Sequence, residues 1–548
     1  MLYIVQNLPF FLILIGPLVF VHELGHFLVA KWCGVRVLRF SLGFGPKLFG
    51  FTRGETEYVI AAVPLGGYVK MWGDDPSQEL SQAEQAGSFL HLALPKRAAI
   101  VLAGPAMNLL LAALVYAGSY MGGVPDASTK LGLVVPGGPA AAAGLEPGDE
   151  ITAIDGTPVE YWNDLQKRIQ ESDGSPMQFT VVREGQTRTL AIAPKMQRER
   201  DELQQPVMRG KIGISVSYVA PMLDVADAAS PAALAGLKIG DEVTHVDGAA
   251  VSSWYHFNKK MRGAADAKVE LTIKRKDETK TIALARATTE KVLEDAHLRP
   301  DPAGFYSGIT SYDARVAKVE SRSPAQKLGL LPGDRLVSIE GKPISAWRFD
   351  LSAFDGADAN KEFHIVYGRG TEIKSGVLKI AEQLREDELR TPVRTYIFGA
   401  ENDPTTLRSD SLIRKRNPVA ALWAGVEHTA LMSKLTLMGA GLMLVGKLSS
   451  KNVGGPVMLF VVAEKAATRG FQTFLEVMAM VSVSLGVMNL LPVPVLDGGH
   501  LVFIGAEAIR RKPLSMRARE YAAIAGLVLL FLLMAFAFIN DFNKFILN

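Results

Sequence analysis

The stretch LVFVHELGHFLVA at residues 18–30 places two histidines and a glutamate inside a run of apolar residues that begins at Met1. Three further apolar stretches, at residues 98–121, 477–496 and 521–540, have a similar length. A membrane span needs roughly 20 apolar residues. An ionisable side chain inside a membrane costs at least about 2.5 kcal/mol, so such residues mark function by default. We therefore expect an α-helical polytopic membrane protein with about four spans and a functional site in the first one.

His22, Glu23 and His26 form an H-E-x-x-H motif within this stretch. Residues four apart on a helix lie about 40° apart around its axis, so both imidazoles project from one face. That geometry suits two nitrogen ligands on one zinc ion, and the adjacent glutamate can take a proton from the attacking water. The alternative is that the motif lies beyond the bilayer edge as ordinary polar residues.

A hydrolytic zinc site takes three protein ligands, so a third ligand must come from another part of the chain. The chain has one cysteine, which excludes a cysteine-rich site. Asp497 is the only carboxylate between Glu476 and Glu507 and lies at the end of the third apolar stretch. It follows Pro492 and Pro494, which end a helix. Asp497 is therefore our candidate third ligand, whereas His500 is a weaker candidate because a fourth protein ligand would close the site.

The charges of the loops predict the orientation of the spans. Lys and Arg are concentrated at residues 31–97 and 510–519, between the first and second and between the third and fourth spans. Positively charged loops stay in the cytoplasm. Both chain ends and the segment 122–469 then lie outside it, and His22, His26 and Asp497 all fall near the cytoplasmic ends of their spans.

The long segment between the second and third spans contains an internal repeat. Its copies begin at Gly138, Ser230 and Ser323, at spacings of 92 and 93 residues. Each copy predicts a short helix with a glycine at its end, a Gly-Asp turn and an alternating strand. These blocks resemble PDZ domains, which implies small β-rich domains whose grooves accept an extended peptide as an added strand. The alternative is that a given copy only fills space or excludes bulky substrates.

These patterns predict the following division of the chain. An N-terminal membrane part with the histidine motif, a cytoplasmic hairpin loop and the second span covers 1–121. PDZ-like domains cover 122–200, 205–290 and 300–383. Residues 384–470 contain a linker and then a helix that lies on the membrane surface, or alternatively a buried helix. A C-terminal membrane part with the aspartate and two spans covers 471–548.

The H-E-x-x-H motif, the run N-x-x-P-x-P-x-L-D-G at residues 489–498 and the intervening PDZ-like repeats together resemble the site-2 protease family of intramembrane zinc metalloproteases, in particular its bacterial sigma-E-regulating members. The resemblance implies that His22, His26 and Asp497 bind Zn²⁺ and that Glu23 is the catalytic acid/base. Those bacterial members usually carry two PDZ domains, whereas three are legible in this sequence.

The resemblance also implies residues that contact the substrate. These are Asn489, Pro492 and Pro494 near the third span, and Gly67, Tyr68 and Val69 in a membrane-associated β-hairpin that holds the substrate; a soluble cytoplasmic hairpin is the alternative. Gly104 and Asn108 resemble a G-x-x-x-N element beside the active site, for which ordinary close helix packing is the alternative.

The implied function is cleavage of a single-pass membrane protein, such as an anti-sigma factor that another protease has already trimmed. The implied location is the bacterial inner membrane, with the PDZ-like domains outside and the active site toward the cytoplasm. The alternatives are clearance of signal-peptide remnants and a non-catalytic PDZ scaffold. Four spans without a span-level repeat argue against a transporter, and a net charge of +3 argues against nucleic acid as a partner.

Overall fold

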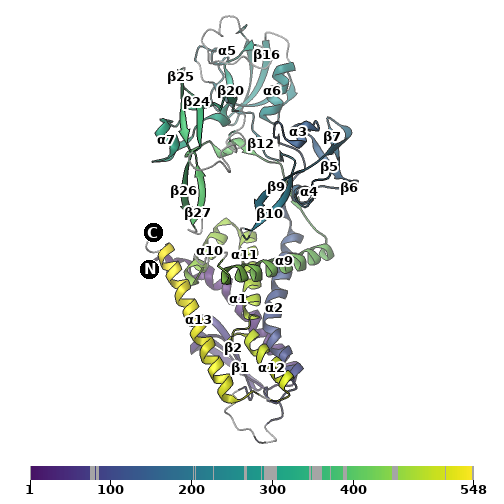
Figure 1. The fold of residues 1–548 in the computed structure, drawn as a ribbon, viewed down its shortest axis with the longest axis vertical. Coiled ribbons are helices and arrows are strands. Elements are labelled where there is room, and N and C mark those ends of the chain that lie inside the picture. The colour runs from purple at the N-terminus through teal and green to yellow at the C-terminus, as the bar shows by residue number, and fades with distance from the viewer. Residues whose placement is uncertain are drawn as a thin grey trace.

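The structure is a computed structural model, which divides into a helical part and a β-rich insert stacked upon it (Figure 1). It describes residues 2–545 except 75–80, 82–84, 202, 204, 226–227, 264–267, 286, 289–304, 345–346, 348–360, 371, 387–391, 447–453 and 513.

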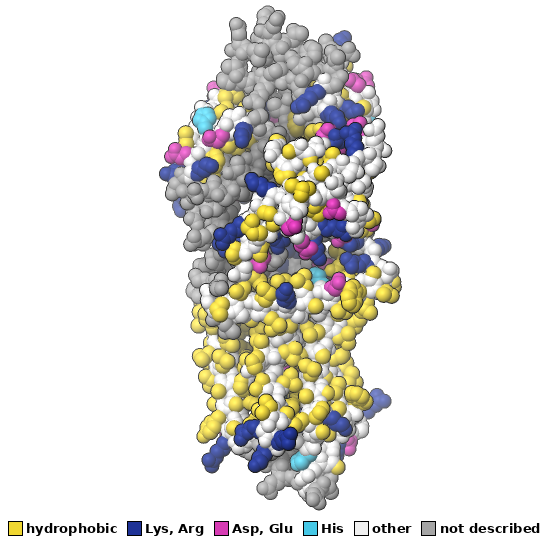
Figure 2. Space-filling model, turned by 45° about the vertical axis from the view of Figure 1, so that its right-hand side comes forward, with side chains coloured by type: hydrophobic (Ala, Val, Ile, Leu, Met, Phe, Trp, Pro, Cys, Tyr) yellow, Lys and Arg dark blue, Asp and Glu magenta, His cyan; other side chains and the backbone are white. Residues whose placement is uncertain are grey.

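Within the part of the chain that the structure describes, four helices are long and apolar enough to cross a membrane. They are α1 (Leu2–Trp32), α2 (Leu94–Gly122), α11 (Phe471–Asn489) and α13 (Met516–Phe545). The first residues of α1 and the last residues of α13 lie at the end of the helical part that faces the insert (Figure 1). Hydrophobic side chains cover the visible face of the helical part, and Lys and Arg gather at its far end (Figure 2). The chain is thus a membrane protein.

Among the described residues, the helical part also contains α9 (Pro418–Leu444), α10 (Pro456–Arg469) and α12 (Asp497–Arg510). Helix α9 runs across α2 and packs against it so closely that a Cβ on Gly425 would lie 2.3 Å from the Ala113 carbonyl oxygen. The Asp541 carboxylate on α13 accepts hydrogen bonds from the backbone N–H groups of Gly455 and Met458 and so caps α10. This contact fixes the start of α10 against α13.

Strands β1 (Val37–Arg53) and β2 (Thr56–Met71) form a sheet beside α1. Residues 37–42 align on one side with 67–71 and on the other with 57–60, while the end of β1 returns beside 56–61. Residues 67–71 therefore form an edge of this sheet. Large apolar side chains are exposed on the sheet, namely Phe44, Leu48, Phe49, Phe51, Ile60 and Val63. Such a surface favours the predicted membrane-associated hairpin over a soluble one.

The insert contains three four-stranded sheets with the same strand order, one in each sequence repeat. Each also has a short first helix, and its glycine at the helix end has positive φ (Gly144, Gly236 and Gly329) as predicted. Copy 1 comprises β4 (Leu133–Val134), α3 (Pro139–Ala142), β5 (Glu150–Ile154), β6 (Thr157–Pro158), α4 (Trp162–Gln170), β7 (Met177–Arg183) and β8 (Gln186–Ile192). Copy 2 comprises β13 (Leu223–Val225), α5 (Pro231–Leu234), β14 (Glu242–Val246), β15 (Ala249–Ala250), α6 (Trp254–Gly263), β16 (Lys268–Arg275) and β17 (Glu278–Ala285). Copy 3 comprises β21 (Lys318–Val319), α7 (Pro324–Leu328), β22 (Arg335–Ile339), β23 (Lys342–Pro343), β24 (Glu362–Arg369) and β25 (Glu372–Lys379).

One buried ion pair recurs in every copy. Arg183 binds Asp149 in copy 1, and its partners in copies 2 and 3 are Arg275 with Asp241 and Arg369 with Asp334. In each case the guanidinium also donates to the carbonyl of the glycine that ends the first helix. The aspartate of the Gly-Asp turn is thereby paired, which offsets part of the cost of burying its charge.

Each copy continues past its predicted end. After the four-stranded sheet comes a hairpin and then a closing strand that pairs with the first strand of the same copy. The hairpins are β9 (Lys195–Arg200) with β10 (Pro206–Lys211), β18 (Ala287–Thr288) with β19 (Phe305–Tyr306), and β26 (Ala381–Glu386) with β27 (Pro392–Ile397). The closing strands are β11 (Ile214–Ser215), β20 (Ile309–Ser311) and β28 (Ala400–Glu401). The domain ends placed at 200, 290 and 383 were thus too early.

The linker predicted to start at residue 384 was also wrong in part. Besides β27 and β28, this segment forms β29 (Leu407–Arg408) and β30 (Ser411–Arg414). They pair with β12 (Tyr218–Val219), ahead of copy 2, and with β3 (Val124–Ala127), directly after α2. Strands of two to four residues are too short to show alternating apolar and polar side chains in the sequence. They form because their backbones pair with distant segments.

Candidate metal centre

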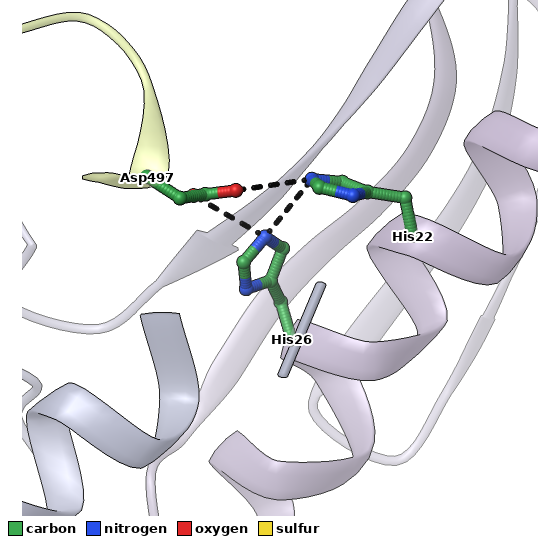
Figure 3. A group of neighbouring side chains, drawn as sticks. All are labelled: His22, His26 and Asp497. Carbon is green, nitrogen blue, oxygen red and sulfur yellow. Dashed lines mark hydrogen bonds and ion pairs between the residues drawn. The ribbon is translucent and has the colours of Figure 1, made fainter. Parts of the chain in front are cut away.

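Three predicted ligands converge although they are up to 475 positions apart in the printed sequence. His22 and His26 lie on one face of α1, and Asp497 opens α12; their side chains point toward one another (Figure 3). Within the part of the chain that the structure describes, this is the group whose donor atoms come within 4.8 Å of one another. His500, the weaker candidate, is not part of it. Both imidazoles are buried in the protein.

The spacing of the donor atoms fits a tetrahedral metal ion. The Nε2 atoms of His22 and His26 are 3.3 Å apart, and they lie 3.2 and 3.5 Å from the Asp497 carboxylate oxygens. A tetrahedral zinc with bonds of about 2.0–2.1 Å separates its ligand atoms by roughly 3.4 Å. The observed distances therefore match a site for this ion with its fourth position left for water or substrate.

Hydrogen bonds on the opposite ring nitrogens fix which nitrogen of each histidine faces the site. His26 Nδ1 lies 2.8 Å from the Ile100 carbonyl oxygen, which accepts its proton. His22 Nδ1 lies 3.3 Å from Nδ2 of buried Asn108, and Oδ1 of the same amide has no hydrogen-bond partner among the described residues. Turned about its last side-chain bond, this amide presents Oδ1 to the Nδ1 proton. Both Nε2 atoms then carry lone pairs, and hydrogen bonds to the opposite ring nitrogen are typical of metal-binding histidines.

Glycines make room for this arrangement on α2. A Cβ on Gly104 would lie 2.3 Å from His26 Nε2 and 2.9 Å from His22 Cε1. A Cβ on Gly25 would lie 2.4 Å from the Ala103 carbonyl oxygen, so α1 and α2 cross here with their backbones almost in contact. Gly104 and Asn108 thus serve the histidines directly, and ordinary packing alone does not account for them.

Two further glycines place Asp497. Helix α11 ends at Asn489, as Pro492 and Pro494 predict, and the chain turns back into α12. A Cβ on Gly498 would lie 2.2 Å from the Leu491 carbonyl oxygen, and one on Gly499 would lie 2.3 Å from that of Val493. The first turn of α12 therefore packs directly onto the Pro-containing turn, which holds the Asp497 side chain toward α1.

Glu23 is buried beside the three candidate ligands and within electrostatic reach of each of them. The edge strand of the sheet passes next to it, since a Cβ on Gly67 would lie 2.8 Å from Glu23 Cγ. A carboxylate between a metal site and an open strand edge is well placed to transfer protons to a peptide bound along that edge.

The other predicted substrate residues lie at different distances from the ligands. Asn489 Nδ2 is 3.5 Å from His22 Nε2, and Pro494 packs against Gly526 of α13. Tyr68 instead accepts a hydrogen bond from Arg39, and Val69 joins the hydrophobic cluster around Val37. Of the three hairpin residues, Gly67 is the one seen next to Glu23.

Sequence reasoning missed an ion cluster below this site. The Glu507 carboxylate on α12 accepts hydrogen bonds from Arg97 on α2 and Arg519 on α13. Glu507 and Arg97 are buried, so the cluster fixes three helices at one point. Arg97 and Arg519 lie 410 and 12 positions from Glu507 in the chain. No local pattern in the sequence indicates that the three residues meet.

Known proteins match this chain over nearly its full length. The family described as peptidase family M50 matches residues 10–533. A protein of Neisseria meningitidis named as a zinc metalloprotease is 34% identical over 97% of this chain and 98% of its own. The regulator of sigma-E protease of Salmonella typhimurium is 30% identical over 99% and 100% of the two chains, and that of Escherichia coli is 28% identical over the same shares. A solved PDZ domain of an SdrC-like protein from Listeria monocytogenes matches 16% of this chain and 92% of its own at 21% identity, with a TM-score of 0.13.

Proposed function

The chain belongs to peptidase family M50 and is an intramembrane metalloprotease; on this premise we propose that it hydrolyses peptide bonds of single-pass membrane proteins with a zinc ion held by His22, His26 and Asp497. The single observation that carries the assignment of ligands is the convergence of three lone-pair donors, from two distant helices, at the spacing of a tetrahedral site.

The residues of the chain divide the chemistry among them. A zinc ion bound here supplies a Lewis acid that activates water and polarises the scissile carbonyl. Glu23 accepts a proton from the attacking water and delivers it to the leaving amine. The Ile100 carbonyl and Asn108 keep the imidazoles in the orientation that presents Nε2. Burial of the site excludes bulk water and strengthens each of these interactions.

The substrate must present an extended backbone, because a helix has no free peptide group to offer. We propose that residues 67–71 add the unwound substrate segment as a strand and so carry its scissile bond past Glu23. The edge position of this segment and the contact between Gly67 and Glu23 support this role. Asn489 lies near enough to His22 to contact the same peptide.

We further propose that the chain lies in a bacterial inner membrane with its insert outside the cytoplasm and its site toward the cytoplasmic face. The basic side chains at the far end of the helical part and the position of both chain ends near the insert support this orientation (Figures 1 and 2). His26 lies six residues before the end of α1, which corresponds to about 9 Å along the helix. The proposed substrate is an anti-sigma factor whose external domain has been removed by an earlier cleavage.

The decisive experiment measures cleavage of a trimmed single-pass substrate by purified protein in detergent. We expect wild type to cleave it, a chelator to stop cleavage and zinc to restore it. Glu23→Gln should bind zinc stoichiometrically yet be inactive, since it keeps the ligands and loses the base. Asp497→Ala should lose both zinc and activity.

Two results would contradict the proposal. Cleavage by Glu23→Gln would mean that another group or another protein performs the reaction. The alternative of a non-catalytic scaffold would hold if wild type purified without zinc and Asp497→Ala left its properties unchanged. Membership of the family does not favour that alternative.

A further inference from the structure

A basic cluster surrounds Glu507 at the end of the helical part that lies away from the insert. The buried Glu507 carboxylate is shared by Arg97 and Arg519, so one positive charge of this group has no anionic partner. The Leu514 N–H also donates to Glu507, which folds the segment between α12 and α13 back over it. Glu520 is an exposed carboxylate nearby, and it is outnumbered by exposed cations that form no ion pair among the described residues, namely Lys96, Arg510, Arg511, Lys512 and Arg517.

The two arginines that share Glu507 each retain an unused donor. The Nε atoms of Arg97 and Arg519 are buried and have no hydrogen-bond partner in the part of the chain that the structure describes. A buried N–H on a charged group is costly to leave without an acceptor. Arg97 is almost fully enclosed, whereas Arg519 is partly exposed and can be reached from outside. The cluster therefore favours one further anionic acceptor on the side of Arg519.

This cluster lies at the depth of lipid headgroups. Arg97 and Arg519 are each the fourth residue of a membrane-spanning helix, since α2 begins at Leu94 and α13 at Met516. The ends of such helices lie at the boundary between the hydrocarbon core and water, where the phosphates of lipids are found. Neither helix has an acidic residue in its first turn, and Lys and Arg gather over this end of the helical part (Figure 2).

An exposed apolar strip on α13 continues from the cluster toward the middle of the span. Arg517, Tyr521, Ile524 and Val528 follow one another at spacings of four, three and four residues, which places them on one face of the helix. All four side chains are exposed. A cation at headgroup depth followed by apolar side chains complements a charged headgroup with an attached acyl chain. A free phosphate ion would use the cation and leave the strip without a partner.

We propose that this cluster binds the phosphate of an anionic phospholipid, with phosphate oxygens on Arg517 and Arg519 and an acyl chain along Tyr521, Ile524 and Val528. Basic sites between membrane-spanning helices are suited to such headgroups. The bound phosphate supplies the second anion that the two guanidinium groups on Glu507 lack, so the lipid strengthens the junction of α2, α12 and α13. This inference concerns the lipid around the protein and does not depend on the proposed cleavage reaction.

The test measures binding of dioleoylphosphatidylglycerol to the delipidated full-length protein in a neutral detergent by native mass spectrometry. Dioleoylphosphatidylcholine, which has the same acyl chains and a zwitterionic headgroup, is the control lipid. Inorganic phosphate and glycerophosphoglycerol, the headgroup without acyl chains, are added as competitors at matched ionic strength. Arg517→Gln and Arg519→Gln remove the proposed phosphate contacts. Arg53→Gln is the matched control, because it removes an exposed cation from the β1–β2 hairpin.

We expect the phosphatidylglycerol to bind at least tenfold more tightly than the phosphatidylcholine and to raise the thermal unfolding midpoint of wild type. Arg517→Gln and Arg519→Gln should each weaken binding of the anionic lipid at least fivefold, and Arg53→Gln should change it less than twofold. Arg517 is exposed and forms no ion pair, so Arg517→Gln should unfold like wild type in the absence of lipid. This variant tests the site even if Arg519→Gln loosens the contact with Glu507.

Three results would overturn the proposal. Equal binding of the two lipids would show that the phosphate charge is not recognised. An equal loss of binding in Arg53→Gln and Arg517→Gln would show a general attraction between surface charges. Displacement of the lipid by inorganic phosphate or glycerophosphoglycerol would assign the cluster to a soluble anion. None of these measurements involves peptide hydrolysis, so failure here is distinct from failure of the proposed protease activity.

Discussion

At the scale of single residues, the chemistry of the site depends as much on absent side chains as on present ones. Histidine, glutamate and aspartate are recognisable in the sequence because their spacing has chemical meaning. The glycines around them are less legible, since a glycine in an apolar helix has many explanations. The structure explains Gly104, because both imidazoles lie where a Cβ at this position would be.

Gly104→Ala is expected to abolish zinc binding without unfolding the protein. The added Cβ would lie 2.3 Å from His26 Nε2, so the imidazole must leave its position. Gly118→Ala is the control, because it lies on the same helix with nothing within 4 Å of the added Cβ. Zinc content by atomic absorption should fall more than tenfold in the first variant and stay stoichiometric in the second. Full zinc occupancy in Gly104→Ala would show that this close approach has no function.

At the scale of elements, the sequence predicted helices better than their junctions. Long apolar stretches identify α1, α2, α11 and α13 because a membrane imposes length and composition on each. Helix α12 was not expected, since its opening Asp-Gly-Gly reads as a turn. In the structure the same three residues begin α12, because Gly498 and Gly499 allow this helix to pack onto the preceding turn.

Glu507 provides a pH-dependent test of how α2, α12 and α13 are held together. Burial alone raises the pKa of its carboxyl, but hydrogen bonds from Arg97 and the Leu514 N–H and the charge of Arg519 outweigh burial and hold the pKa below its ordinary value. The ionised form therefore stabilises the fold above the unfolded-state pKa of about 4.3, and this contribution is lost as pH falls through the lower folded-state pKa.

We expect Glu507→Gln to lower the thermal unfolding midpoint at pH 7, because removal of one partner of a buried ion pair costs about 3–5 kcal/mol. The difference from wild type should shrink progressively below pH ~4, where Glu507 itself becomes protonated. Glu520→Gln on α13, an exposed position, should match wild type at both pH values. A deficit that is the same at pH 7 and at low pH would assign the effect to packing instead of charge.

At the scale of the whole molecule, the triplication was visible in the sequence but its closure was not. The repeat period follows from three matching blocks of nineteen residues. The hairpins and the closing strands of two or three residues lie outside those blocks. Strands β12 and β29 also lie outside them, and their paired residues Tyr218 and Arg408 are 190 positions apart. The sequence predicted that His22, His26 and Asp497 would lie together, from the H-E-x-x-H motif and the single carboxylate of the third apolar stretch. No comparable pattern indicates that β3 pairs with β30.

The alternative role of the insert, exclusion of substrates that still carry bulky external domains, predicts the effect of removing it. Deletion of residues 128–410, with Ala127 joined to Ser411 through a two-residue Asn-Gly turn, keeps the β3–β30 ladder intact. We expect this variant to cleave substrate that still carries its external domain, while wild type cleaves only the trimmed form. The same deletion with Glu23→Gln is the inactive control. If the deletion variant still requires prior trimming, the insert is not the filter.

The pairing of β3 with β30 also bears on how such an insert changes in evolution. The two strands place the chain's exit from α2 and its return toward α9 next to each other, at the spacing of about 5 Å between paired strands. The whole insert between these two strands therefore connects them in the same way as the loop of a single hairpin would. Recombination can add or remove a repeat within that loop without moving a helix end, so copy number and catalysis are free to evolve independently, and the domains behave as an exchangeable cassette.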